Sequence, residues 1–168
     1  MKFKTVLMMV ALVAFSSNSV FARSIDPRHV VAKIDAQMMG LESATLLDSG
    51  ELIVIADGSE QLFTKKLSPS LASRLEGLAI QLADAEVKTV KKDVVCMTFV
   101  AVSGSELSVS GYDSNTGRFD GSTRLILSQR GCSVHVETFP RKRSQLSVAD
   151  QLKSLLEVLA QDLVESNR

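Results

Sequence analysis

The chain has 168 residues, with 19 basic and 19 acidic side chains, one Tyr, seven Phe and no Trp. A balanced charge and few aromatic rings argue against general nucleic-acid binding, which uses positive charge and stacking surfaces, and they weaken a sugar-binding hypothesis. The length suits a single domain with one hydrophobic core.

Residues 1–22 follow the pattern of a secretory signal peptide. Lys2 and Lys4 precede an apolar run over residues 6–15, and residues 20–22 read Val-Phe-Ala, which a signal peptidase accepts. The apolar run is shorter than the roughly 17 residues that cross a bilayer, so we expect cleavage after residue 22 and no stable membrane insertion afterwards. The sequence therefore predicts export to the periplasm or the extracellular medium. The mature domain, residues 23–168, then has 17 basic and 19 acidic residues, a net charge of −2.

Cys96 and Cys132 are the two cysteines of the chain. An oxidising compartment favours a bridged pair over free thiols, so we expect a disulfide between them. On the chain-entropy model a loop of this length stabilises the fold by roughly 4 kcal/mol.

Two patterns compete over residues 28–39. Asp26 and Pro27 would cap and start a helix, with apolar residues at helical spacing behind them. The alternative is a strand, because apolar and polar side chains also alternate from Val30 to Met38. We favour the strand, since three further short strands, at residues 43–48, 51–56 and 60–67, follow with Gly- and Asp-containing turns between them. Residues 52–55 are all apolar, which predicts a strand covered on both faces.

Ser68 and Pro69 predict the start of a helix whose apolar stripe is Leu71, Leu75, Leu78 and Leu82. The polar segment 86–93 that follows is interpreted as a solvated connection. A second helix is expected after the capping sequence at residues 147–150, with its own apolar stripe: Val148, Leu152, Leu155, Leu156, Leu159 and Leu163.

The stretch from residue 94 to residue 139 contains the clearest strand patterns. We expect a buried strand at residues 94–102, a half-buried strand around Leu107 and Val109, and a hairpin of residues 123–128 and 132–139 that turns at 129–131. Cys132 and His135 lie three apart in the last strand and so point to opposite faces. This parity argues against a catalytic or metal-binding pair, and we assign no catalytic residue, cofactor or metal site.

The segment from residue 113 to residue 122 is expected to be a long loop. Asp113 and Asn115 resemble the first ligands of an EF-hand, but Gly117, Arg118 and Arg124 occupy positions that such a calcium loop reserves for other residues. Loops on a rigid sheet commonly carry binding residues, and aromatic and Arg side chains are frequent interface anchors. The candidate partner-binding residues are therefore Tyr112, Asp113, Asn115, Arg118 and Phe119.

One dense basic cluster remains, formed by Arg141, Lys142 and Arg143. It is a candidate anion-binding site for a lipid headgroup, polysaccharide or nucleic acid, although three charges are weakened by salt screening.

The order of elements predicts an α+β fold, with an antiparallel sheet and two amphipathic helices packed on it. Our leading hypothesis is an exported, non-enzymatic binding module, such as an inhibitor or accessory protein for another exported protein. Two alternatives stay open: a small exported hydrolase whose residues meet only in the fold, and an envelope protein that binds anionic lipid or polysaccharide. The sequence lacks the nucleophile-elbow, zinc-protease, P-loop and dinucleotide-binding motifs.

Overall fold

The computed structural model describes residues 25–38, 41–56, 61–93, 105–123, 129–130 and 134–168. The first half contains a 3₁₀ turn, four strands and a helix: η1 (Pro27–His29), β1 (Val30–Met38), β2 (Leu41–Leu47), β3 (Glu51–Ala56), β4 (Leu62–Lys66) and α1 (Pro69–Ala83). The second half contains five strands and a helix: β5 (Val87–Asp93), β6 (Ser105–Asp113), β7 (Arg118–Thr123), β8 (Gln129–Arg130), β9 (Val134–Pro140) and α2 (Arg143–Glu165).

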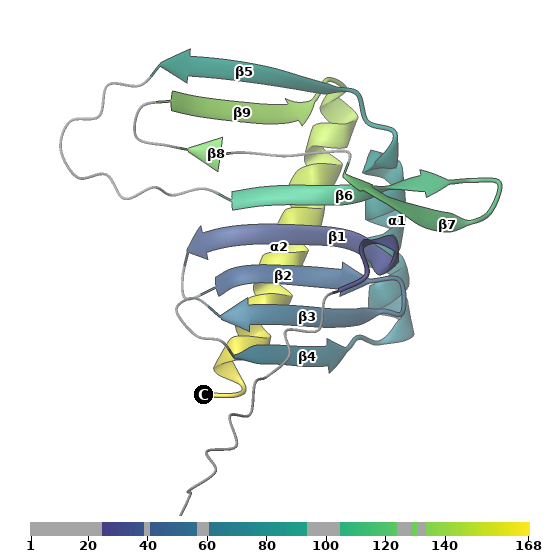
Figure 1. The fold of residues 1–168 in the computed structure, drawn as a ribbon, viewed down its shortest axis with the longest axis vertical. Helices are drawn as coiled ribbons and strands as arrows, with labels where there is room; N and C mark the ends of the chain where they lie inside the picture. The colour runs from purple at the N-terminus through teal and green to yellow at the C-terminus, as the bar shows by residue number, and fades with distance from the viewer. Residues whose placement is uncertain (1–24, 39–40, 57–60, 94–104, 124–128, 131–133) are drawn as a thin grey trace, which may run out of the picture.

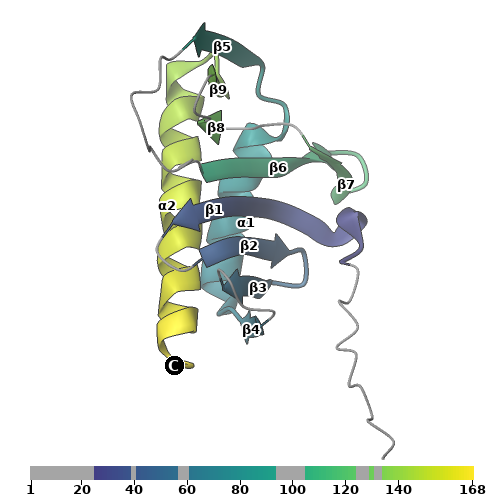
Figure 2. The ribbon, with the colours of Figure 1, turned by 60° about the vertical axis from the view of Figure 1, so that its left-hand side comes forward.

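The described strands form two antiparallel sheets (Figure 1). The larger sheet has the strand order β4-β3-β2-β1-β6-β7, and the smaller sheet has the order β5-β9-β8. Figure 2 shows that α1 and α2 cover the same side of the strands, and α2 runs past both sheets. The predicted α+β fold, with two helices on an antiparallel sheet, is confirmed.

The core lies between the helices and the larger sheet. Cross-strand rows of apolar residues face the helices: Ala32 pairs with Leu46 and Val109, and Ile34 pairs with Ala44 and Leu107. These side chains are almost fully buried, with exposed fractions of 0 to 1%. The other face is more polar, as the 2.6 Å ion pair between Lys33 and Asp35 illustrates. The alternation that predicted the strands therefore separates an apolar face under the helices from a more polar face.

Strand β3 departs from its prediction on one face. It lies inside the sheet as expected, and Leu52 and Val54 are fully buried under the helices. Ile53 and Ile55 point to the opposite face, where they are only half-buried. Complete coverage of both faces was therefore wrong, because both helices pack on the same side of the sheet.

The open question over residues 28–39 is resolved in favour of the strand. Asp26 caps only the single 3₁₀ turn η1, with its side chain accepting a hydrogen bond from the Arg28 backbone N–H at 3.0 Å. The chain then extends into β1, which pairs with β2 on one side and β6 on the other. The capping sequence and the strand alternation are therefore both reflected in the structure. The helix stops after one turn because β1 is stabilised by pairing with a strand on each side.

Both helices are present, and α1 begins at Pro69 behind the Ser68 cap as predicted. Helix α2 begins at Arg143, one turn before the predicted capping sequence at residues 147–150. Gln145 in this extra turn donates a hydrogen bond to the Gln81 carbonyl at the end of α1, at 3.2 Å. This contact between helices was invisible in the local pattern. Neither described helix is long and apolar enough to cross a membrane.

The second half contains more strand than the sequence predicted. Segment 86–93 is mostly strand β5, which pairs with β9 across a long sequence separation, so interpreting it as a loop was wrong. Residues 118–123 form β7, which shortens the predicted loop to a turn over residues 114–117. Gln129 and Arg130 pair with β9 instead of forming the turn. The predicted strand at 94–102 and the segment 124–128 lie outside the described residues.

Gly77 in α1 offers a test of helix stability. A Cβ at this position would meet no atom of the described residues beyond the helix's own backbone within 4 Å, so Gly77→Ala introduces no clash with them. Ala also restricts the unfolded chain more than Gly, and we expect the variant to be more stable by about 0.5 to 1 kcal/mol. Urea unfolding followed by circular dichroism measures this change, and a midpoint equal to or below that of the wild type would contradict it.

Candidate functional site

A pocket of about 530 Å³ lies at one end of the larger sheet, beside the β6–β7 hairpin. We call it the end pocket. Three separate parts of the described chain line it: η1, the turn between β2 and β3, and strand β7. The lining residues are Arg28, His29, Asp48, Arg118, Phe119 and Asp120.

Gly121 allows β7 to pack directly on η1. Its φ angle is +75°, a conformation that favours glycine, and a Cβ there would lie 3.1 Å from the Pro27 carbonyl oxygen and 3.2 Å from the Arg28 backbone nitrogen. The missing side chain thus permits two backbones to approach closely. This approach brings Arg28 and His29 beside the residues of β7.

Arg28 is held by its neighbour Asp26. Its Nε atom lies 3.0 and 3.1 Å from the two carboxylate oxygens, and Nη2 lies 2.6 Å from Oδ2. The hydrogen bonds that Arg28 donates, from its side chain and then its backbone, lower the pKa of Asp26 to about 2. The positive charge of Arg28 is therefore largely compensated before any ligand arrives, although its side chain remains 78% exposed.

His29 forms an ion pair or neutral hydrogen bond with Asp48, whose Oδ2 atom lies 2.9 Å from Nδ1. An ionised carboxylate only accepts hydrogen bonds, so Nδ1 is the donor and Nε2 of the neutral ring is left as an acceptor. The backbones also meet, since the Asp48 N–H donates to the His29 carbonyl at 2.8 Å. A histidine oriented by a carboxylate is part of the arrangement that a hydrolase needs, but neither Ser nor Cys is among the described residues that line the pocket.

The β6–β7 hairpin is braced from within. The rings of Tyr112 and Phe119, which are paired across the two strands, meet edge to face with centroids 5.3 Å apart. Asp113 accepts hydrogen bonds from the Asn115 N–H at 2.9 Å and the Thr116 hydroxyl at 3.0 Å. These bonds, the one from the Asn115 backbone first, lower the pKa of Asp113. The hairpin, which extends beyond the neighbouring strands in Figure 1, therefore has a defined turn.

Arg118 differs from the other charged residues of the end pocket. Asp48 is paired with His29, and Asp120 accepts hydrogen bonds from the Ser122 backbone at 2.8 Å and the Ser122 hydroxyl at 2.5 Å. Within the part of the chain that the structure describes, Arg118 is exposed and has no ion-pair partner. Its guanidinium is thus available to an anionic group from outside.

The candidate partner-binding residues of the sequence separate into two groups. Arg118 and Phe119 line the end pocket, whereas Tyr112, Asp113 and Asn115 support the hairpin from β6 and the turn. Sequence reasoning missed four lining residues: Arg28, His29, Asp48 and Asp120. If β1 and β2 were expected to form a hairpin that turns between Met38 and Leu41, residues 29 and 48 would be expected to lie close together. The register shifts between β1 and β2 make this pairing hard to predict from the sequence.

The structure says less about the other sites predicted from the sequence. Cys96 and Cys132 lie outside the described residues, so their disulfide stays a prediction. Arg141, Lys142 and Arg143 are exposed at the start of α2, where Lys142 occupies the N-cap without a side-chain cap hydrogen bond. Over the described ranges, no cluster of three or more His, Cys, Asp or Glu side chains is arranged to hold a metal ion.

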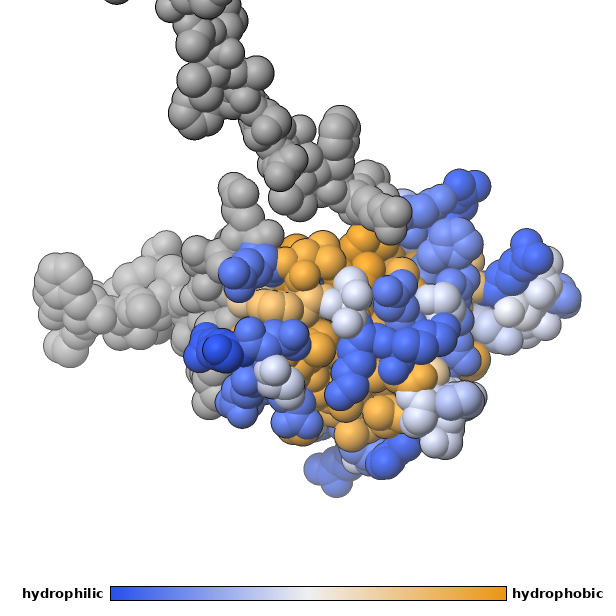
Figure 3. Space-filling model, turned by 90° about the horizontal axis from the view of Figure 1, so that it is seen from below, coloured by the Kyte–Doolittle hydropathy of each residue, from blue (hydrophilic) through white to orange (hydrophobic). Residues whose placement is uncertain are grey.

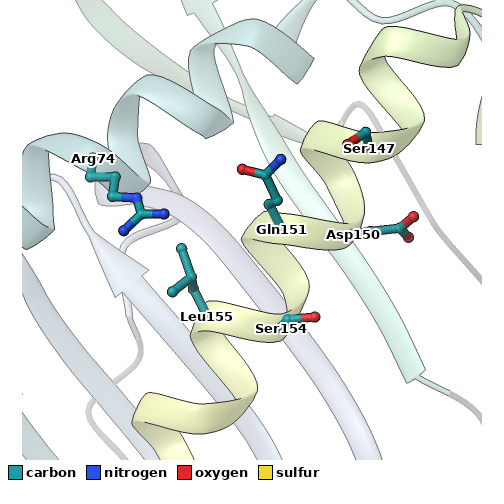
Figure 4. Close-up of a pocket in the computed structure, with 6 residues that line it drawn as sticks. All are labelled: Arg74, Ser147, Asp150, Gln151, Ser154 and Leu155. Atoms are coloured by element: carbon teal, nitrogen blue, oxygen red, sulfur yellow. The ribbon is translucent and has the colours of Figure 1, made fainter.

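A second pocket, of about 350 Å³, lies between the exposed sides of the two helices (Figure 4). Arg74 extends from α1 towards Gln151 and Leu155 of α2, while Ser147, Asp150 and Ser154 complete the lining. Like Arg118, Arg74 has no ion-pair partner among the described residues. This pocket brings together fewer charged groups, and Arg74 is useful as a matched control for Arg118.

The β4 edge of the larger sheet is a weaker candidate for a contact surface. Figure 3 looks onto this edge and shows apolar surface interrupted by hydrophilic side chains. Leu62 is 47% exposed there, but Lys65 and Lys66 are exposed on the same strand. Lysines on an edge strand oppose pairing with another sheet.

Glu76 of α1 links pH to the stability of the sheet end. Half-burial, and then the negative charge of Asp48, raise the pKa of Glu76. The folded state therefore holds this proton more tightly than the unfolded state, so the contribution of Glu76 to stability falls as the pH rises through its folded pKa. We expect Glu76→Gln to stabilise the protein at pH 7 and to lose this advantage towards pH 4. Urea midpoints at both pH values measure the change, and an equal effect at both would contradict it.

The end pocket is therefore the most developed site of the described chain, with a paired His29 and Asp48, a compensated Arg28 and an unpaired Arg118 around the half-buried ring of Phe119. Comparison of the chain with protein-family models, with curated proteins and with solved structures found no match.

Proposed function

We propose that this protein is an exported, non-enzymatic binding module that contacts another exported protein through the end pocket and the β6–β7 hairpin. The observation that carries the proposal is the unpaired Arg118, which lines the end pocket together with Phe119 of the same braced hairpin. Arg and aromatic residues are the most frequent energetic anchors of protein interfaces. The signal-peptide pattern of residues 1–22 supplies the exported setting.

The hairpin is suited to binding because its shape is fixed in advance. The Tyr112–Phe119 contact and the Asp113 turn hold it without a partner. A pre-ordered surface loses less conformational entropy on association than a flexible loop, so more of the contact energy appears as affinity. An inhibitor or an accessory protein would use such a surface.

The test is chemical crosslinking in cells that produce and export the tagged protein. We expect a discrete adduct with the wild type and a yield reduced about tenfold or more for Arg118→Glu, since reversing the charge of an interface anchor costs a few kcal/mol. Arg74→Glu is the matched control, because Arg74 is also unpaired among the described residues but lies between the helices. Equal yields for the wild type and both variants would overturn the proposal.

A hydrolase is the second candidate function, favoured by the His29–Asp48 pair. A carboxylate that orients a histidine through Nδ1 is part of many general-base arrangements. If the purified protein hydrolysed an ester or phosphodiester, and His29→Ala removed that turnover while Arg118→Glu left it, the binding proposal would give way to this one.

The third possibility, an envelope protein that binds anionic lipid or polysaccharide, rests on Arg141, Lys142 and Arg143. Their exposure at the start of α2 leaves them accessible. Sedimentation with anionic vesicles that weakens with salt, and that disappears when the three residues are changed to Gln, would support it.

A further inference from the structure

We propose that the end pocket recognises an acidic side chain of an extended peptide segment, with the carboxylate on Arg118 and an adjacent apolar side chain against Phe119. The inference rests on the proposed function, since it assumes a protein partner, and it adds the chemistry of the segment that the pocket takes.

The charged residues of the pocket favour a ligand group that carries one negative charge. Arg28 is bonded to Asp26, Asp48 to His29, and Asp120 to Ser122, so these groups enter the complex already partnered. Arg118 remains as a positive charge without an ion-pair partner among the described residues. A guanidinium matches a carboxylate in a bidentate, planar contact, which is stronger and more directional than a contact with an ammonium group.

The same charges argue against phosphate. A phosphate group with close to two negative charges would come near the Asp48 and Asp120 carboxylates, which line the pocket together with Arg118. Like charges within a few ångströms repel each other, so a second negative charge on the ligand weakens binding. A carboxylate carries one negative charge, which matches the one positive charge of Arg118.

The rest of the lining suits a peptide. Phe119 is half-buried and lines the pocket, which favours an apolar side chain next to the acidic one. When the His29 ring is neutral and Nδ1 donates to Asp48, its Nε2 atom can accept a hydrogen bond from a peptide backbone N–H. A volume of about 530 Å³ accommodates two adjacent side chains and the backbone between them.

The test is an NMR titration of the purified protein with two capped dipeptides, acetyl-Leu-Glu-amide and acetyl-Leu-Gln-amide, and with inorganic phosphate. We expect the Glu peptide to shift the Arg118 Nε–H and the Phe119 and His29 ring signals, and to bind about tenfold more tightly than the Gln peptide, because it alone offers a charged acceptor. Phosphate should bind more weakly than the Glu peptide.

Variants separate this chemistry from a general charge effect. Arg118→Gln should lower the affinity for the Glu peptide about tenfold. Arg118→Lys should retain part of that affinity, and Arg74→Gln should leave it unchanged. The inference would be overturned if the two peptides bound equally, if phosphate bound more tightly than the Glu peptide, or if Arg118→Gln left the affinity for the Glu peptide unchanged. If the peptides fail but Arg118→Glu still removes the crosslinked adduct, the proposed function stands and only the ligand chemistry is wrong.

Discussion

Gly121→Ala is expected to lower the free energy of unfolding by about 2 to 4 kcal/mol and to disrupt the end pocket. A positive φ strains any residue with a Cβ, and here the Cβ would also press on the backbone of η1, at 3.1 Å from the Pro27 oxygen and 3.2 Å from the Arg28 nitrogen. Backbone atoms yield less readily than the end of a side chain. The relief is a movement of η1 away from β7, which separates Arg28 and His29 from Arg118.

Gly117→Ala is the matched control, because Gly117 also has a positive φ of +66° but, among the described residues, a Cβ there would meet only the Tyr112 hydroxyl, at 3.7 Å. Its expected loss is about 1 kcal/mol, from the backbone conformation alone. Urea unfolding measures both losses, and the His29 ring signals report the displacement of η1. Equal losses for the two variants, with unchanged His29 signals in both, would show that the contact between β7 and η1 has no structural role.

The strands of the first half were predictable because their apolar residues alternate over short distances. In β3, Leu52 and Val54 mark one face, and local turns define where the strand begins and ends. Strand β5 was missed because Lys88, Lys91 and Lys92 resemble a solvated segment, and its partner β9 lies about 50 residues away. Its position at the edge of the smaller sheet is compatible with lysines, a role that only the pairing reveals.

The candidate site was predictable only in part, for a similar reason. Arg118 and Phe119 were noticed through their residue types and their place near a turn. Arg28 and His29 looked like the flank of a strand, and Asp48 like an ordinary turn residue. They meet β7 because β1 pairs with β6, and because Gly121 lets β7 approach η1. Such long-range packing leaves no periodic signal in a single sequence.

Helix α2 provides the other large expected effect. It packs against β1, β2, β3 and β4 of the larger sheet and against β9 of the smaller one, as its course past both sheets in Figure 1 shows. Its buried residues are Ala149, Leu152, Leu156, Ala160, Leu163 and Val164. Because one helix contributes to both sheets, loosening it should weaken them together, and the described elements should unfold in one cooperative transition.

Leu156→Ala should therefore reduce the free energy of unfolding by about 3 kcal/mol, since Leu156 is fully buried and the truncated side chain leaves a cavity beneath the sheet. Val158→Ala, on the same helix, is the control with an expected change within about 0.5 kcal/mol, because Val158 is 57% exposed. Urea unfolding followed by circular dichroism and by Tyr112 fluorescence should give coincident transitions for both variants. A separate, unshifted transition in Leu156→Ala would mean that part of the fold is stable without the α2 contact.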